Sequence, residues 1–305
     1  MPRVVFVLVP QLHLLDLAGP AQAFWTAGDL GYGYELTYVS EAPTVPTAQG
    51  VPVSSNTSWP SLTADDLVVI PGWRAASRPQ PTVGPEHLQR IADHHAGRGT
   101  VASVCAGAFA LGSAGLLDGR RCTTHHDLQD ALAQRYPAAT VLRDVLYTTD
   151  ERVVTSAGIA SGIDLALHLI AARDGVSAAA RVAREMVVYA RRNGDEPQAS
   201  AMLRYRSHLS ETIHQVQDLI DARFTDSLRL ADLADALKVS ERTLTRMFTT
   251  ATGLTPLRYQ QALRIERAEH LIGHGSTIEA AARAVGFSDA RMLRRLRARG
   301  GAQSR

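Results

Sequence analysis

One cysteine stands where a strand is expected to turn into a helix, in the run Cys105-Ala106-Gly107-Ala108. The small residues after it permit a sharp turn, and such a turn exposes a nucleophile at the edge of a sheet. The start of the following helix is the positive end of its dipole, and that field stabilises a thiolate. The pattern therefore predicts an exposed Cys105 thiol with a lowered pKa.

Other candidate site residues follow other apolar runs. Asp16 comes after the run at residues 4–9, and Gly72 and Trp73 come after the run at 67–70. In an open parallel sheet the carboxyl ends of the strands meet at one edge, where ligands bind. The sequence thus favours a pocket that brings Asp16, Gly72 and Trp73 to Cys105 and Ala106.

A repeated helical motif carries the second set of candidate functional residues, which are mainly arginines. Residues 231–240 are echoed by residues 278–288, and in each copy small and apolar residues at helical spacing lead to a short break and a serine, Ser240 or Ser288, that can cap the next helix. Between the copies, Pro256 opens an apolar-striped helix that runs to Ile272. Tandem helix-turn-helix units of this kind place two recognition helices in successive major grooves, roughly 34 Å apart. The repeat predicts DNA binding.

The recognition helices divide into an inner and an outer face. Leu244 and Phe248 are expected inside the first, and Met292, Leu293 and Leu296 inside the second. The predicted DNA-facing set is Ser240, Glu241, Arg242, Thr245, Arg246, Ser288, Asp289, Arg291, Arg294 and Arg295. Arg242 and Arg246 are the strongest candidates for base contacts, because arginine pairs bidentately with guanine. For the arginines near the end of the chain, a merely solvated helix face is the alternative.

The elements that position these residues change character along the chain. Up to about residue 190, short β-branched runs alternate with helical stretches, which indicates a mostly parallel sheet covered on both faces. The expected strands are 4–9, 34–39, 67–70, 100–104 and 153–156, and the expected helices are 20–27, 85–96, 108–114, 127–136, 162–172 and 177–189. Pro20 and Pro85 suit first helical turns, and His126 suits the cap of the helix at 127.

The segment from Ser207 to Arg299 resembles the DNA-binding domain of AraC-type transcriptional regulators, and residues 256–268 resemble the linker helix of that domain. The second unit departs from the pattern. The segment Thr252-Gly253-Leu254-Thr255-Pro256 that follows the first unit has no counterpart after the second, and Arg297 stands where an aromatic core residue is typical. We therefore expect the second unit to be less stable and to depend more on phosphate contacts.

Residues 101–125 resemble the PfpI-type branch of the class I glutamine amidotransferase-like superfamily, especially the GlxA subgroup, in which such a domain is fused to an AraC-type reader. The resemblance implies a flavodoxin-like α/β fold. It makes Cys105 the elbow cysteine, Asp16 the acidic residue facing it and His125 the histidine that arrives 20 residues later. Gly72 would offer a backbone N–H near the thiol.

The match also contains departures that bear on catalysis. Hydrolytic members commonly carry a histidine after the cysteine, where this chain has Ala106, and Trp73 stands where a second glycine is frequent. Three interpretations of the pocket remain open: a ligand-binding or redox-sensing site, a structural remnant, or turnover of the isocyanide hydratase or glyoxalase type.

Composition sets the outer limits. The chain has 305 residues, is 45% hydrophobic and has a formal net charge of +2. Residues 206–305 hold 16 Arg and Lys against 11 Asp and Glu, so the basic charge lies where DNA is expected. Two cysteines form no disulfide framework, no His/Cys spacing is that of a structural zinc site, and no apolar run suits a signal peptide or membrane span.

These observations converge on one hypothesis. Residues 1–192 form a PfpI-like α/β sensor and dimerisation domain, 193–206 a linker, and 207–305 an all-α domain with two helix-turn-helix units. The expected function is cytoplasmic, non-enzymatic and sequence-specific regulation of transcription, modulated by a small molecule or oxidant, with no cofactor and no metal. The expected partners are double-stranded promoter DNA, RNA polymerase, an effector and a second copy of the chain. The alternative is a cysteine-dependent enzyme with an accessory helical domain.

Overall fold

The computed structural model describes residues 1–74, 83–188, 194, 198, 205, 208, 210–273 and 275–300, with the backbone alone at 298–300. The chain forms two compact units, Met1–Gln198 and Ala199–Arg305. Most of the predicted linker, 193–206, lies outside the described residues, so its boundaries stay a prediction. Among the described residues, no helix is long and apolar enough to cross a lipid bilayer.

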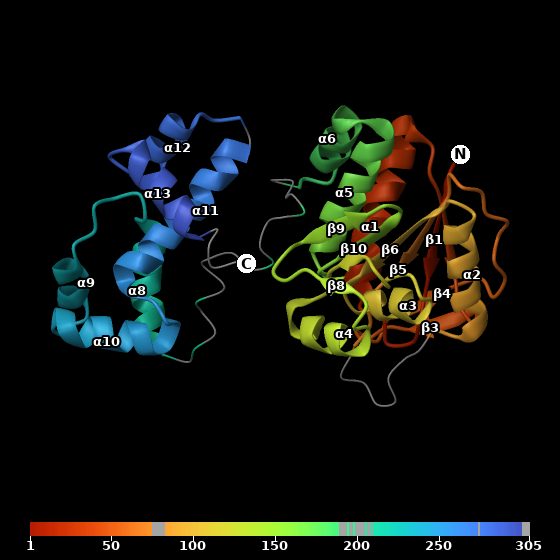
Figure 1. Ribbon diagram of the computed structural model, residues 1–305, viewed down its shortest axis with the longest axis horizontal. Helices are drawn as coiled ribbons and strands as arrows, with labels where there is room; N and C mark the ends of the chain where they lie inside the picture. Colours follow the sequence, from red (N-terminus) through yellow and green to blue (C-terminus); the bar gives the residue numbers. More distant parts are fainter. Residues whose placement is uncertain are drawn as a thin grey trace. The chain divides into compact units, whose positions relative to one another are not determined.

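A six-stranded sheet forms the centre of the first unit (Figure 1). Its strands run in the order β2-β1-β5-β6-β10-β9, and all neighbours are parallel except β10 and β9. The strands of the unit are β1 (Arg3–Val7), β2 (Glu35–Val39), β3 (Thr44–Pro46), β4 (Pro52–Ser54), β5 (Leu67–Ile70), β6 (Thr100–Val104), β7 (Arg121–Cys122), β8 (Thr140–Val141), β9 (Tyr147–Asp150) and β10 (Val153–Ser156). The residues of β1 and β5 are almost wholly buried, as expected of strands covered on both faces.

Helices cover the sheet on both sides (Figure 1). They are α1 (Leu14–Ala27), α2 (Pro85–Ala96), α3 (Ala108–Ser113), α4 (Gln129–Arg135), α5 (Ser161–Asp174) and α6 (Val176–Glu185), with short turns η1 (Gly28–Tyr32), η2 (Cys105–Gly107) and η3 (His126–Leu128). The flavodoxin-like α/β prediction is confirmed.

The prediction for the first helix is wrong at its start. It begins at Leu14 and not at Pro20, which lies inside it. Pro20 is the seventh residue of α1 and has no backbone N–H, so the carbonyl of Asp16 does not receive the usual helical hydrogen bond from four residues ahead. The consequence for the site is that Asp16 belongs to the first turn of α1 and not to a loop.

The second unit is all helical. It contains α8 (Glu211–Ala222), α9 (Leu230–Ala236), α10 (Glu241–Thr252), α11 (Pro256–Gly273), α12 (Ile278–Ala284) and α13 (Ala290–Gly300). The pairs α9–α10 and α12–α13 are the two predicted helix-turn-helix units. The long helix α11 contributes Tyr259 and Leu263 to the core of the first and Ala268 to the core of the second. One continuous helix therefore carries both units.

Candidate functional site

Four neighbouring parallel strands deliver the pocket residues to one edge of the sheet. The segment after β1 leads to Asp16, Gly72 follows β5, and Cys105 follows β6. The loop after β10 adds Gly158 and Ile159. The structure thus brings Asp16, Gly72 and Cys105 together as predicted, because the carboxyl ends of adjacent parallel strands converge.

Cys105 has the strained backbone of an elbow residue. Its φ is +54°, a value rare for residues other than glycine, and it is only 5% exposed. Gly72 and Gly158 lie so close that a Cβ atom on either would overlap the Cys105 side chain. The expectation of an exposed thiol is therefore wrong, because the loops after β5 and β10 close over it.

Asp16 is fully buried beside the thiol. Its Oδ1 accepts a 2.5 Å hydrogen bond from the backbone N–H of Ile159, while Oδ2 has no hydrogen-bond partner among the described residues. Burial raises the pKa of Asp16 to about 6, although the bond from Ile159 acts in the opposite direction. Ile159 itself has a φ of +51°, so the hydrogen bond to Asp16 holds a β-branched residue in a strained conformation.

The electrostatics of Cys105 are the reverse of those expected from its sequence. Burial raises the pKa of the thiol far above its ordinary value, and the nearby Asp16 carboxylate raises it further. The backbone N–H of Ala106 acts in the opposite direction but is outweighed. Desolvation of a thiolate therefore exceeds the favourable field of the following helix. At neutral pH Cys105 is a protonated thiol, which is a weak nucleophile.

His125 does not activate the thiol. Its ring accepts a 3.4 Å hydrogen bond from the backbone N–H of Asp127, and no hydrogen bond joins it to Cys105, both residues being described. Burial and the neighbouring His126 lower the pKa of His125. The residue that does contact the elbow is Thr124, whose Oγ1 donates to the Cys105 carbonyl at 2.7 Å. The predicted capping role of His126 belongs instead to His125, which precedes η3.

The remaining predicted pocket residues are buried. The Trp73 side chain belongs to the hydrophobic core, and its backbone pairs with Leu12. Ala106 is fully buried within η2. Gly158 and Ile159 were not predicted, although the signal was present, since Gly158 follows a recognised strand by the same rule that singled out Gly72.

Asp16→Asn should make the protein more stable at neutral pH. The folded pKa of about 6 lies above the ordinary 3.8, so the folded state binds the extra proton between these values and stability falls as pH rises from 4 to 6. The raised pKa corresponds to a loss of about 3 kcal/mol of folding stability. This loss is absent below pH 4, where Asp16 is protonated in both states, and complete above pH 6, where it is ionised in both. Urea unfolding of the full chain should therefore give equal stabilities at pH 4 and a variant more stable by up to about 3 kcal/mol at pH 7.

Tryptophan fluorescence isolates this effect, because Trp25, Trp59 and Trp73 all lie in the first unit. Other groups titrate over the same range, and the difference between the two proteins cancels them. A difference that does not change between pH 4 and pH 7 would show that Asp16 is not the buried acid.

The second candidate site is the outer face of α10. Ser240 caps this helix by accepting from the backbone N–H of Thr243 at 3.2 Å. Leu244 and Phe248 are fully buried, whereas Arg242 and Arg246 are exposed. The predicted inner and outer faces of this helix are confirmed. Glu241, Arg242, Thr245, Arg246 and Thr249 line a shallow hollow on the outer face.

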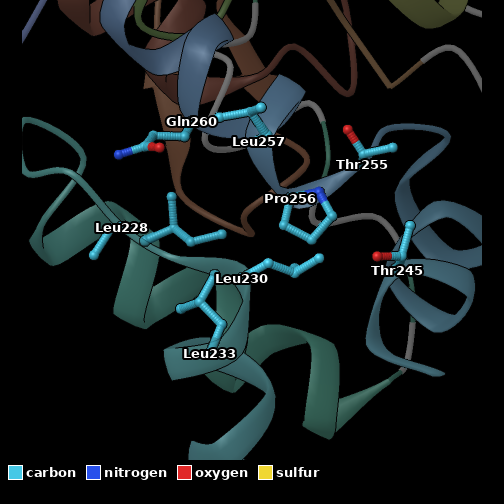
Figure 2. Close-up of a pocket in the computed structure, with 9 residues that line it drawn as sticks. Leu228, Leu230, Leu233, Thr245, Thr255, Pro256, Leu257 and Gln260 are labelled. Atoms are coloured by element: carbon cyan, nitrogen blue, oxygen red, sulfur yellow. The ribbon is translucent and has the colours of Figure 1, made fainter. Parts of the chain in front are cut away.

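An apolar cavity of about 300 Å³ lies beside this helix (Figure 2). Its lining comes from α8 to α11 and the turns between them: Ile220, Leu228, Leu230, Leu233, Thr245, Thr255, Pro256, Leu257 and Gln260. None of these side chains is charged. The cavity is therefore chemically distinct from the basic face of α10, although Leu230 and Thr245 line both.

The second helix-turn-helix unit differs from its prediction in two respects. Helix α13 begins at Ala290, and the Asp289 carboxylate accepts from the backbone N–H of Arg291 at 2.8 Å, so Asp289 and not Ser288 occupies the capping position. Met292 is 37% exposed and lies outside the core, which Leu293 occupies. Asp289, Arg291, Arg294 and Arg295 are exposed as expected, and Arg294 also forms an ion pair with Glu279 on α12.

Arg297 has a structural role in place of the typical aromatic residue. Its guanidinium makes two hydrogen bonds to the Glu269 carboxylate on α11, at 2.6 and 3.0 Å. This bidentate pair is half exposed, and it fastens α13 to α11. The unit therefore replaces an apolar anchor with an ionic one.

Comparison with known proteins agrees with this architecture. The DJ-1/PfpI family model matches residues 2–172, and a helix-turn-helix domain model matches residues 233–299. The HTH-type transcriptional regulator GbdR of Pseudomonas aeruginosa is 28% identical over 273 residues, covering 88% of this chain and 72% of GbdR. The isonitrile hydratase of Pseudomonas putida is 32% identical over 185 residues, covering 58% of this chain and 74% of that enzyme.

A solved structure supports the same fold for the first unit. The crystal structure of an AraC family transcriptional regulator from Pseudomonas putida superposes with a TM-score of 0.53 at 23% identity, covering 61% of this chain and all of that one. The chain therefore belongs to the DJ-1/PfpI family, and it joins that domain to a helix-turn-helix domain as the GlxA-like regulators of the AraC type do.

Proposed function

We propose that the protein regulates transcription by binding promoter DNA through both helix-turn-helix units, in response to an effector that acts at the Cys105 pocket. One observation carries the DNA-binding part: a single helix, α11, holds two helix-turn-helix units whose second helices expose arginines. Two recognition helices held by one continuous helix can enter two successive major grooves of DNA.

The two units are expected to contribute differently to DNA recognition. Among the described residues, Arg242 and Arg246 form no ion pair with an acidic side chain, so both are available to bases or phosphates. In the second unit Arg294 and Arg297 are paired with Glu279 and Glu269. We therefore assign base reading mainly to α10, and orientation on the backbone mainly to α13.

Arg242→Ala and Arg246→Ala test this assignment. If the side chain pairs with a base, each substitution should weaken promoter binding by about 1–3 kcal/mol. If it contacts a phosphate instead, the slope of log affinity against log salt concentration should fall by about 1. Fluorescence anisotropy with a labelled promoter duplex across a salt series measures both quantities. Arg223→Ala is the matched control, because Arg223 lies at the end of α8 and pairs with Asp226. Unaltered affinity in both α10 variants would contradict the proposal.

Several features of the first unit support a sensor and not an enzyme. Cys105 is protonated, no histidine follows it, and His125 is not hydrogen-bonded to it. An enzyme of the isonitrile hydratase type needs an activated nucleophile. Because Cys105 and Asp16 are buried, a small molecule or an oxidant reaches them only if the loops around Gly72 and Gly158 move.

A chain of contacts leads from the pocket to the end of the first unit. The Thr124 hydroxyl donates to the Cys105 carbonyl, and the Thr124 carbonyl accepts from Gln198 Nε2 at 2.9 Å. Gln198 Nε2 also donates to the carbonyl of Val145 at 3.1 Å. Since Gln198 is the last residue of the first unit, we propose that movement of the elbow alters how the chain leaves that unit.

Cys105→Ser separates sensing from DNA binding. The variant should keep the promoter affinity of the natural chain, because Cys105 lies in the other unit from the recognition helices. In cells, a reporter driven by the promoter should lose its response to the effector. Loss of promoter binding in the purified variant would contradict the separation of roles, and an unchanged reporter would contradict the pocket as the sensor.

The remaining partners follow from this function. We propose a homodimer formed through the first unit, action in the cytoplasm where the chromosome lies, and contact with RNA polymerase at the promoter. The enzymatic alternative predicts turnover that disappears with Cys105→Ser and equal affinity for all DNA sequences.

A further inference from the structure

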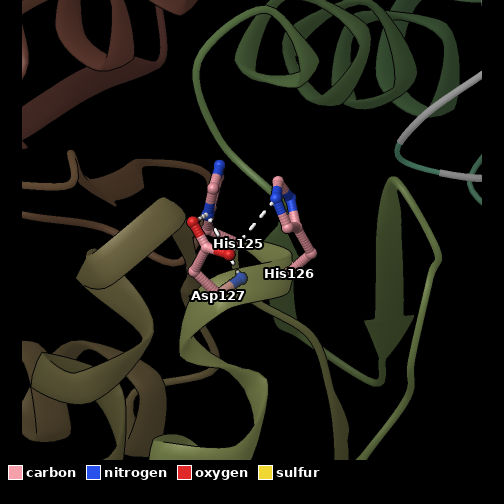
Figure 3. A group of neighbouring side chains, drawn as sticks. All are labelled: His125, His126 and Asp127. Atoms are coloured by element: carbon pink, nitrogen blue, oxygen red, sulfur yellow. Dashed lines mark hydrogen bonds and ion pairs between the residues drawn. The ribbon is translucent and has the colours of Figure 1, made fainter. Parts of the chain in front are cut away.

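A group of possible metal ligands lies next to the Cys105 pocket, on the turn η3. It consists of His125, His126 and Asp127, each of which offers one ligand atom within 4.8 Å of the others. Figure 3 shows both imidazole rings projecting on the same side of the turn, with the Asp127 carboxylate reaching towards each. His125 was already predicted to belong to the Cys105 pocket, whereas His126 and Asp127 were not, and no metal site was expected from the sequence.

The distances suit a small divalent cation. Nδ1 of His125 lies 3.7 Å from Oδ2 of Asp127, and Nε2 of His126 lies 3.4 Å from Oδ1 of Asp127. In a tetrahedral zinc site with bonds of about 2.0–2.1 Å, neighbouring ligand atoms are about 3.3 Å apart. These two distances end on different oxygens of the Asp127 carboxylate, and the single ligand atoms of the three residues lie within 4.8 Å of one another, so side-chain rotations that move ligand atoms by up to about 1.5 Å would bring all three onto one ion.

The chemistry of the three groups agrees with the same class of ion. Two imidazoles and one carboxylate are ligands of Zn²⁺ and of Co²⁺. The present partner of His125 is a weak one, the 3.4 Å contact of its ring with the backbone N–H of Asp127. His126 and Asp127 are exposed, so an ion reaches the site from solvent, and solvent can complete its coordination.

We propose that His125, His126 and Asp127 bind one Zn²⁺ ion. The site adjoins Thr124, which donates to the Cys105 carbonyl and accepts from Gln198. A bound ion would therefore stiffen the segment that joins the pocket to the end of the first unit. This proposal does not depend on the function proposed above, because binding of the ion is measured without DNA.

Isothermal titration of the chelator-treated full chain with Zn²⁺ tests the site. The natural chain should bind one equivalent, and His126→Ala and Asp127→Asn should each weaken binding at least about tenfold. Both side chains are exposed, so neither substitution is expected to affect folding. His168→Ala is the matched control, since His168 lies elsewhere in the first unit against Tyr147, and it should bind as the natural chain does.

Co²⁺ gives a second readout that identifies the ligands. With nitrogen and oxygen ligands the complex should show visible d–d absorption without the near-ultraviolet band of a thiolate ligand, and Cys105→Ser should leave the spectrum unchanged. No saturable binding, or saturable binding that survives both His126→Ala and Asp127→Asn, would overturn the proposal. A thiolate band that disappears with Cys105→Ser would also overturn it, by placing the ion at the elbow.

Discussion

Arg264→Met should destabilise the helical unit, Ala199–Arg305, by about 3 kcal/mol and loosen the connection between its two helix-turn-helix units. Arg264 lies on α11, and its guanidinium donates to three backbone carbonyls: Phe224 at 2.6 Å, Asp226 at 2.6 Å and Gly286 at 3.0 Å. The first two precede the first helix-turn-helix unit, and Gly286 forms the turn of the second. One side chain therefore ties both units to the helix between them.

The contact with Gly286 is the part that cannot be replaced. Gln260 Nε2 also donates to the carbonyls of Phe224 and Asp226, so these keep a partner in the variant. The Gly286 carbonyl would lose its guanidinium donor, and Phe287 would lose the cation 5.5 Å from its ring centroid. We therefore expect the second helix-turn-helix unit to detach from α11 first. Promoter affinity should then fall towards that of a single helix-turn-helix unit.

Two matched variants sharpen the measurement. Arg264→Lys keeps the charge but not the planar fork, so it should recover only part of the stability and affinity. Arg267→Met removes an exposed arginine from the same helix and should change stability by less than about 0.5 kcal/mol. Circular dichroism during thermal unfolding reports the helices. Equal effects at positions 264 and 267 would contradict the bridging role.

Gly286→Ala should be at least as damaging, by about 3 kcal/mol or more. Gly286 has a φ of +82°, and an added Cβ would overlap the backbone carbonyl oxygen of Thr225. A backbone atom cannot rotate away as a side chain does. The turn of the second helix-turn-helix unit, at Gly286, must therefore move away from Thr225.

Gly275→Ala is the control that measures only the cost of a left-handed backbone conformation, without a steric overlap. Gly275 has a φ of +92°, yet a Cβ there meets nothing within 4 Å. It should therefore cost only about 1 kcal/mol, the conformational penalty. Tryptophan fluorescence, which reports the first unit, should be unchanged in both variants. Equal losses in the two variants would show that the close approach to Thr225 contributes nothing.

The two turns explain why the repeat was readable from sequence. At the corresponding position of the first unit the chain has Lys238, with a φ of +55°, so both copies use a left-handed residue to reverse direction. Apolar spacing, the capping Ser240 and this break are local signals, and local signals sufficed to place α9 to α12. They did not reveal the role of Arg264, because its three partners lie 22 to 40 residues away along the chain.

The pocket shows the opposite case. The strand runs predicted that Asp16, Gly72 and Cys105 would meet, because topology alone brings strand ends together. The state of the thiol was predicted wrongly, since it depends on how completely the loops around Gly72 and Gly158 exclude water. Burial arises from packing across the whole sheet edge, and no short sequence pattern records it.

The most direct test of the central claim is the binding of the full chain to the DNA upstream of its own gene, compared with a scrambled duplex of equal length across a salt series. A regulator with two readers should prefer its own sequence by at least about 10³-fold, with affinity falling steeply as salt rises. Equal and weak binding to both duplexes would contradict sequence-specific regulation.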